Sequence, residues 1–246
     1  AVPSFKKGVV AYCELVRLVP HFADAHLGVG FLLAELSHPE EAMHHYGEAI
    51  RLKPTEAIAH YNLGSALEAV HRYEDAIGAY RQAVRLDHSY AQAYSGLGTC
   101  FASLDKWDDA QRWYREALLV NPQDATAHSN LGVALTEKRQ FEDAERAFRE
   151  ALRLDPGYVD ALLRLGWTLA AQHKYAEAVE AYEQALRLQG DNAAAHARLG
   201  GALSLLGKHQ EAIEICQKAV TLDPVDPDGH YNLGVALSNA GRHDEA

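Results

Sequence analysis

The chain of 246 residues lacks most features on which a membrane protein or a disulfide-stabilised domain depends. Its three cysteines, Cys13, Cys100 and Cys216, are odd in number and far apart, so they form neither a disulfide framework nor a zinc-ligand spacing. No apolar run approaches the roughly 18 residues that a membrane span needs. A hydrophobic content of 48% is nevertheless enough for a buried interior, so we expect a soluble, intracellular chain without membrane insertion.

Basic charge is also scarce. The chain has 23 lysines and arginines against 34 aspartates and glutamates, which gives a formal net charge of −11. Nucleic acids are bound mainly through clustered lysine and arginine side chains, so this balance argues against a nucleic-acid partner. Acidic pairs such as Glu74-Asp75 fall where helices are predicted to begin, and there they complement the positive end of the helix dipole.

Motifs for catalysis, cofactors and metal ions are missing as well. The sequence has no glycine-rich phosphate loop, no GxSxG and no HExxH. Five of the 14 histidines share one register, but zinc ligands lie about 2.0–2.1 Å from the ion, whereas stacked helices place equivalent side chains roughly 8–10 Å apart. We therefore predict no catalytic residue, no cofactor and no metal site. The histidines are interpreted as half-buried packing side chains, with a pH-sensitive role as the minor alternative.

What the sequence has instead is a period of 34 residues. Glycine recurs at this interval in one register, alanine in two, and proline and an aromatic residue in most units. The glycine register is Gly30, Gly64, Gly98, Gly132, Gly166, Gly200 and Gly234. The aromatic register is Tyr46, Tyr80, Tyr114, Phe148 and Tyr182. Seven glycines in phase make a chance pattern negligible.

Each period has the apolar spacing of two helices. In the unit that begins at Ala57, apolar residues at i, i+3, i+4 and i+7 predict a first helix, and the stripe from Tyr73 to Val84 predicts a second. A glycine inside a helix costs about 1 kcal/mol relative to alanine, so its recurrence needs a compensating gain. Close packing against the aromatic residue of the second helix supplies that gain, and proline then ends the second helix.

These residues carry a family resemblance. The pattern of one unit is Leu63, Gly64, Leu67, Tyr73, Ala76, Tyr80 and Ala83. It recurs through nearly the whole chain and resembles the signature of the tetratricopeptide repeat. The resemblance implies an all-α solenoid: a right-handed superhelix of antiparallel helix pairs with a 34-residue period, in which the first helix of each unit lines a concave groove.

The period divides the chain into a single repeat array over residues 1–246. We predict full repeats at 23–56, 57–90, 91–124, 125–158, 159–192 and 193–226. Residues 1–22 would supply a second helix only, and residues 227–246 a first helix and the start of a second. Both ends fall inside a repeat, so we expect a fragment of a longer protein whose cut ends can self-associate.

The sixth residue of each unit lies on the face of the first helix that packing determines least. It reads Gly28, Asn62, Gly96, Asn130, Arg164, Arg198 and Asn232. In the tetratricopeptide family this position faces the groove, and the asparagines resemble the ladder in the repeat arm of O-linked N-acetylglucosamine transferases. The resemblance implies that Asn62, Asn130 and Asn232 hold the backbone of an extended peptide, since an amide both donates and accepts hydrogen bonds.

Side chains near the asparagines would add selectivity. Arg164 and Arg198 predict a preference for an acidic partner, and Trp167, three residues after Arg164, would anchor an apolar side chain. The alternative is a solvated face on which the arginines pair with Asp160 or Glu137. The remaining predicted groove residues are Ser65, Tyr61 and Tyr231. Ser65, Ser95, Thr99 and Ser129 make neighbouring positions small and polar, and Tyr61 and Tyr231 would edge the groove.

Three functions stay open on these grounds. We expect a non-catalytic scaffold that binds an extended peptide or protein segment in the groove. The second interpretation is the substrate-recognition arm of a larger enzyme such as a glycosyltransferase, and the third is a self-assembling scaffold. A clamp for the acidic tails of heat-shock chaperones is disfavoured, because first-helix positions such as Tyr61 lack the lysine of that subtype.

Overall fold

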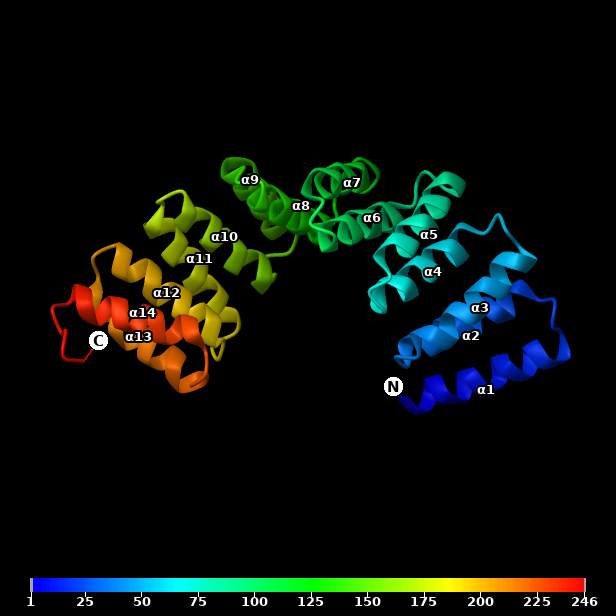
Figure 1. Ribbon diagram of the computed structural model, residues 1–246, viewed down its shortest axis with the longest axis horizontal. Helices are drawn as coiled ribbons and strands as arrows, with labels where there is room; N and C mark the ends of the chain where they lie inside the picture. The colour runs from blue at the N-terminus through cyan, green and yellow to red at the C-terminus, as the bar shows by residue number, and fades with distance from the viewer. Residues whose placement is uncertain (1, 246) are drawn as a thin grey trace. The chain divides into compact units, whose positions relative to one another are not determined.

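A computed structural model describes residues 2–245, and of residues 2–7 and 9 it describes the backbone only. Within this range every regular element is an α-helix, and there are fourteen (Figure 1). In chain order they are α1 (Val2–Leu18), α2 (Ala23–Glu35), α3 (Pro39–Leu52), α4 (Ala57–Ala69), α5 (Tyr73–Leu86), α6 (Ala91–Ser103), α7 (Trp107–Val120), α8 (Ala125–Glu137), α9 (Phe141–Leu154), α10 (Val159–Ala171), α11 (Tyr175–Leu188), α12 (Ala193–Leu205), α13 (His209–Leu222) and α14 (Pro227–Asn239). The predicted all-α class is confirmed.

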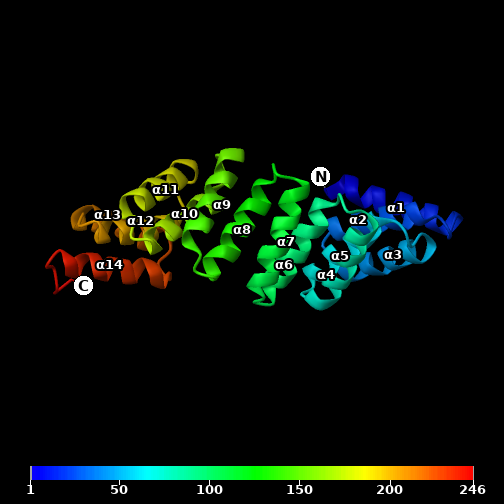
Figure 2. The ribbon, with the colours of Figure 1, turned by 90° about the horizontal axis from the view of Figure 1, so that it is seen from above.

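The chain forms two compact units, Ala1–Pro122 and Gln123–Ala246. In the first unit α2 packs on α3, α4 on α5 and α6 on α7, and in the second α8 packs on α9, α10 on α11 and α12 on α13. Each hairpin also packs on the next one within its unit, so that consecutive helices lie side by side in both views (Figures 1 and 2). Each unit is therefore a stack of helical hairpins.

The first helices of the hairpins start where the full repeats are predicted to start. These positions are Ala23, Ala57, Ala91, Ala125, Val159 and Ala193. The final helix, α14, takes the place of the first helix of a seventh hairpin and begins at Pro227. Residues 240–245 then form turns rather than the start of a second helix, and the last alanine of the register, Ala246, lies outside the described residues.

Glycine and aromatic residues interlock within five of the six hairpins, as the sequence predicts, whereas in α12–α13 Gly200 packs against Cys216. A Cβ atom on Gly30 would come within 2.6 Å of the Tyr46 ring, and one on Gly132 within 2.7 Å of the Phe148 ring. These distances are shorter than van der Waals contact, so the ring occupies the space that any larger residue would need. Tyr46 is 2% exposed and Phe148 is 1% exposed, which places both in the interior.

The two helices of each hairpin are joined by a turn with one residue of positive φ. Seven residues at the 34-residue interval have this conformation, six of them in hairpin turns and the last one after α14: Ser37, His71, Asp105, Arg139, His173, Gly207 and Gly241. At one such turn the backbone N–H of His71 donates to the carbonyl of Glu68, and that of Arg72 donates to the carbonyl of Leu67, both at 2.9 Å. This pair of bonds is the Schellman motif, which satisfies carbonyls at the end of the first helix.

Four residues of the histidine register, His26, His60, His196 and His230, tie the loop before their unit to its first helix. The Nε2 atom of His60 lies 3.0 Å from the carbonyl oxygen of Pro54, and that of His196 lies 3.0 Å from the carbonyl oxygen of Gly190. A carbonyl only accepts, so the imidazole donates from Nε2. The interpretation of these residues as packing side chains is thus incomplete, because they anchor the loops. Among the described residues no three potential ligands gather to hold a metal ion.

Candidate functional site

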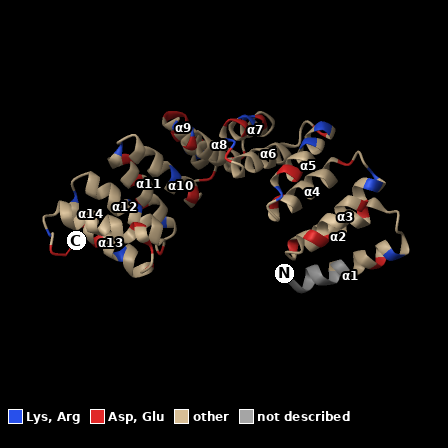
Figure 3. Cartoon of the chain, in the orientation of Figure 1, with Lys and Arg blue, Asp and Glu red and all other residues tan. Residues whose placement is uncertain are grey.

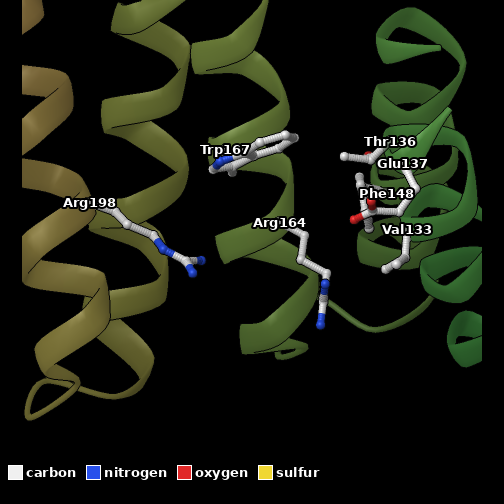
Figure 4. A pocket seen from close by; sticks show the side chains of 7 residues that line it. All are labelled: Val133, Thr136, Glu137, Phe148, Arg164, Trp167 and Arg198. Carbon is white, nitrogen blue, oxygen red and sulfur yellow. The ribbon is translucent and has the colours of Figure 1, made fainter. Parts of the chain in front are cut away.

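A pocket of the second unit brings together three of the residues that the sequence singles out. It has a volume of about 180 Å³ and is bounded by side chains of α8, α9, α10 and α12 (Figure 4). We call it the Arg–Trp pocket, and its lining residues are Val133, Thr136, Glu137, Phe148, Arg164, Trp167 and Arg198. In Figure 4, Trp167 projects from α10 toward α8, and Arg198 extends from α12 toward α10.

Trp167 gives the Arg–Trp pocket an apolar wall. Its side chain is 47% exposed, although its neighbour Thr168 is fully buried. The indole forms a T-shaped contact with the ring of Phe141, with 6.2 Å between ring centroids and an interplanar angle of 66°. Phe141 in turn lies under the guanidinium of Arg139 at 5.9 Å. The indole is thus supported on one side and accessible on another, which suits it to anchor an apolar side chain.

The two arginines of the pocket differ in how their charge is matched. Arg164 donates from Nε to Asp160 Oδ2 at 2.6 Å, one helical turn away. Arg198 is half-buried and has no ion pair or hydrogen bond with any described residue. Burial raises the pKa of the Tyr182 phenol to about 12, and the positive charge of Arg198 opposes that rise. The alternative of paired arginines therefore holds for Arg164 and not for Arg198.

The Arg–Trp pocket also contains one carboxylate. Glu137 is the last residue of α8, is exposed, and forms no ion pair within residues 2–245. It faces the pocket from the helix opposite the arginines (Figure 4). The pocket is thus polarised, with an unmatched cation on α12 and an unmatched anion on α8.

A larger pocket of the first unit contains Tyr61, Asn62 and Ser65. We call it the Glu35 pocket; its volume is about 570 Å³. Asn62 is half-buried, and Ser65 is exposed. The ring of Tyr61 packs against that of Tyr90 with 4.8 Å between centroids, so Tyr61 belongs to an aromatic cluster at the pocket's edge. Its other lining residues are Phe31, Ala34, Glu35, Ser37, Pro39, Tyr46, Ala66 and Ala69.

The relationship to known proteins follows from a family match over almost the full length. The model of the cilia and flagella-associated protein 70 C-terminal domain matches residues 11–246. The chain belongs to this family. A search of curated proteins gives no match.

Solved structures similar to this family member share its fold. A chain of the APC/C hetero-tetramer Cut9-Hcn1 aligns with a TM-score of 0.75 and 21% identity, over 95% of this chain and 46% of that chain. PilF of Pseudomonas aeruginosa aligns with a TM-score of 0.74 and 19% identity, over 85% and 95% of the respective chains. YrrB, described as a tetratricopeptide protein with an unusual peptide-binding site, aligns with a TM-score of 0.62 and 24% identity, over 75% and 95%.

These likenesses establish a helical-repeat fold of the tetratricopeptide type. The identities lie below 25%, so they carry the fold and no binding property to this chain. This member of the cilia and flagella-associated protein 70 family spans less than half the length of the Cut9-Hcn1 chain that it matches. None of the helices in the part of the chain that the structure describes is both long and apolar enough to cross a membrane.

The remaining predicted groove residues of the family member have different surroundings. Asn130 is half-buried on α8, and Tyr231 on α14 is 72% exposed. The amide of Asn232 donates from Nδ2 to the carbonyl of Ala197 at 3.0 Å, so it joins α14 to α12. Ser129, one of the small polar positions next to the predicted groove residues, is only 1% exposed.

Sequence reasoning missed four residues that complete the Arg–Trp pocket in this family member. Val133 and Thr136 were not singled out, Phe148 was assigned to packing alone, and Glu137 was considered only as an arginine partner. The signal was available in the period, since the pocket combines the ninth, twelfth and thirteenth residues of one first helix with the sixth and ninth of the next. Once a residue of one first helix is a candidate for a site, the residues that face it from the preceding first helix belong to the same site.

Proposed function

We propose that the chain is a non-catalytic protein-interaction scaffold whose second unit binds an acidic, extended peptide segment in the Arg–Trp pocket. The volume of about 180 Å³ lies below the roughly 300–1,000 Å³ of small-molecule sites. It suits one side chain of a longer ligand. Both predicted selectivity elements, an arginine and an accessible tryptophan, line it together.

The observation that carries the proposal is the unmatched charge of Arg198. Its guanidinium is half-buried in the pocket and has no hydrogen bond or ion pair within residues 2–245. A ligand carboxylate would supply the missing anion through charge-assisted, often bidentate, hydrogen bonds. Arg164 would contribute less, because Asp160 already accepts from it at 2.6 Å.

Trp167 determines the second requirement of the ligand. Because Trp167 is 47% exposed and its indole packs against Phe141, it offers a rigid apolar surface at low entropic cost. An acidic residue with an apolar neighbour is therefore the sequence that the pocket fits best. The half-buried amide of Asn130 would hold the peptide backbone beside this pocket.

The test measures the fluorescence anisotropy of labelled 12-residue peptides added to the full chain. One peptide carries glutamates beside leucines, and a second carries glutamines at the same places. We expect the acidic peptide to bind more tightly, and Arg198→Gln to weaken it roughly tenfold, which corresponds to about 1.4 kcal/mol. Trp167→Ala should weaken both peptides.

The matched control is Arg187→Gln, which removes the same charge from an exposed site on α11. Circular dichroism checks that every variant keeps its helices. Equal binding of the acidic and neutral peptides, or equal losses in the Arg187 and Arg198 variants, would contradict the proposal.

A further inference from the structure

The Glu35 pocket of the first unit occupies the same repeat positions as the Arg–Trp pocket, three periods earlier in the chain. The two pockets share six positions: three residues of one first helix, the aromatic residue of its hairpin, and two residues of the next first helix. The equivalent residues are Phe31 and Val133, Ala34 and Thr136, Glu35 and Glu137, Tyr46 and Phe148, Asn62 and Arg164, and Ser65 and Trp167.

At these positions the first unit keeps the negative charge of the second unit and lacks its positive charges. The carboxylate is retained as Glu35, whereas the positions of the two arginines hold Asn62 and Gly96. A Cβ atom on Gly96 would come within 2.6 Å of the Tyr80 ring, so packing leaves no room for a long cationic side chain there. No lysine or arginine lines the Glu35 pocket, and α2 and α4 contain none along their length (Figure 3).

Glu35 is also free of an internal counter-ion. Its carboxylate is exposed at the end of α2 and forms no ion pair with the described residues. Burial and then the charge of Glu35 raise the pKa of the Tyr46 phenol to about 12, so the carboxylate acts on the floor of the pocket. The pocket therefore presents a negative charge above a neutral, apolar floor.

A second carboxylate lies at an adjoining pocket of about 320 Å³, which shares Ser65 and Ala69 with the Glu35 pocket. Glu68 lines it and accepts a hydrogen bond from the Tyr80 hydroxyl at 2.8 Å. No described lysine or arginine pairs with Glu68, and burial raises the pKa of its carboxyl group. Glu35 and Glu68 therefore line adjoining pockets, and neither forms an ion pair with a described lysine or arginine.

Phe31 completes the surface. Its side chain is 49% exposed in the Glu35 pocket, which places an accessible aromatic ring beside the carboxylate. An aromatic face attracts a lysine or arginine cation, and it also packs against an apolar side chain. The first unit thus has an aromatic anchor like the second, on the opposite helix of the pocket and with the opposite charge beside it.

We infer that the Glu35 pocket binds a basic side chain of an extended peptide, lysine or arginine, with the neighbouring apolar residue packed on Phe31. Charge complementarity selects this occupant, because the pocket is lined by the carboxylate of Glu35 and by no lysine or arginine. The inference rests on the proposed function for the claim that the repeats bind peptides. It adds that the two units have opposite charge preferences.

The experiment uses the full chain and three labelled 12-residue peptides that contain phenylalanine and leucine at fixed places. They differ only at the charged places, which hold lysine, glutamine or glutamate. We expect the lysine peptide to bind more tightly than the glutamine peptide, and Glu35→Gln to weaken it roughly tenfold. Glu68→Gln should weaken it as well, while the glutamine side chain keeps an oxygen that accepts from Tyr80.

The control is Glu40→Gln, which removes the same charge from the exposed first turn of α3 outside the pocket. The inference is overturned if the lysine peptide binds no better than the glutamine peptide, or if the Glu35 and Glu40 variants lose equal affinity. The glutamate peptide separates the two proposals. If the glutamate peptide binds through Arg198 and the lysine peptide does not bind, only the inference about the first unit is wrong. If the lysine peptide binds through Glu35 and the glutamate peptide does not bind, only the acidic preference proposed for the second unit is wrong.

Discussion

The Glu35 pocket and the Arg–Trp pocket share their framework and differ in almost every side chain that a ligand would touch. Tyr46 and Phe148 form their floors and are both nearly inaccessible. Around these floors, neutral Asn62 in one unit corresponds to cationic Arg164 in the other. The comparison shows that the repeat keeps packing and recognition on separate registers, so one can change while the other stays constant.

The energies of the two kinds of position explain this separation. Removing a buried aromatic side chain costs about 3–5 kcal/mol, so the floor positions are tightly restricted. The groove positions are half-buried or exposed, and the only ion pair that they form among the described pocket residues is Arg164 with Asp160, which is worth about 0–1 kcal/mol at the surface. Their replacement affects a ligand more than it affects the fold.

The largest effect is expected at the glycines beneath the floors. Gly30→Ala and Gly132→Ala place a Cβ atom within 2.6 and 2.7 Å of Tyr46 and Phe148, respectively. Overpacking should destabilise both units by about 1–3 kcal/mol, despite a gain of about 1 kcal/mol in helix propensity. Urea denaturation followed by circular dichroism measures the loss.

Gly234→Ala is the matched control for that experiment, because no atom lies within 4 Å of its added Cβ. Propensity alone then applies, and stability should rise by up to about 1 kcal/mol. The shared framework would be refuted if the control lost as much stability as the two floor variants, or if only one unit were affected.

A smaller effect is expected when the charge difference itself is altered. Asn62→Arg brings into the first unit the cation that the second unit has as Arg164, and it supplies Glu35 with an internal partner. Binding of the lysine peptide should fall roughly tenfold. Conversely, Glu137→Gln removes the only carboxylate among the described lining residues of the Arg–Trp pocket, so the affinity for the glutamate peptide should rise severalfold. Anisotropy titrations measure both changes.

Asn62→Gln serves as the control, since it lengthens the side chain without adding charge. If it weakens the lysine peptide as much as Asn62→Arg does, shape rather than charge determines the difference between the pockets. If the Glu137 variant binds the glutamate peptide with unchanged affinity, Glu137 does not oppose an acidic ligand, and the description of the Arg–Trp pocket as polarised is wrong.

The smallest effect concerns pH. In the first unit the Nδ1 atoms of His26 and His45 lie 3.2 Å apart, and burial, followed by His26 and His44, lowers the pKa of His45 against the opposing charges of Glu41 and Glu48. A folded-state pKa below the unfolded value of about 6.5 means that the folded state binds fewer protons. The contribution of His45 to the free energy of unfolding is therefore fully present above about pH 6.5. It is lost as the pH falls from there through the folded-state pKa.

The second unit has Ala147 at the position of His45, so it lacks this pair. Hydrogen exchange of α3 and α9 amides at pH 7.5 and 5.5, corrected for intrinsic rates, should show a loss of protection in α3 that His45→Ala abolishes. Equal losses in α3 and α9, or a loss that persists in the variant, would show that the pair has no such role.

The sequence allowed the framework to be predicted because the period imposes it. Glycine and aromatic residues recur 16 positions apart in five units, as Gly64 and Tyr80 do, and this regular pairing indicates that they pack against each other. Arg164, Trp167 and Arg198 line one pocket, since helical spacing within a unit and the 34-residue interval between units are both geometric.

Other details depend on contacts that a pattern does not contain. Asn62 and Asn232 share a register, yet Asn62 lines a pocket and Asn232 bonds to a neighbouring helix, because its surroundings determine where an amide points. The matched charge of Arg164 and the unmatched charge of Arg198 depend on Asp160, which has no counterpart before Arg198: Ala194 stands at that place. Such differences between units follow from local partners and not from the period.

The left-handed turns make the chain tolerant of changes in composition at these points and intolerant of changes in length. Serine, histidine, aspartate, arginine and glycine all occupy the turn residue, so backbone geometry rather than a particular side chain closes each hairpin. One inserted residue would rotate the start of the following helix by about 100°. At the turn of His71 that rotation would carry Tyr80 away from Gly64, and the unit would lose its core without losing a single apolar residue.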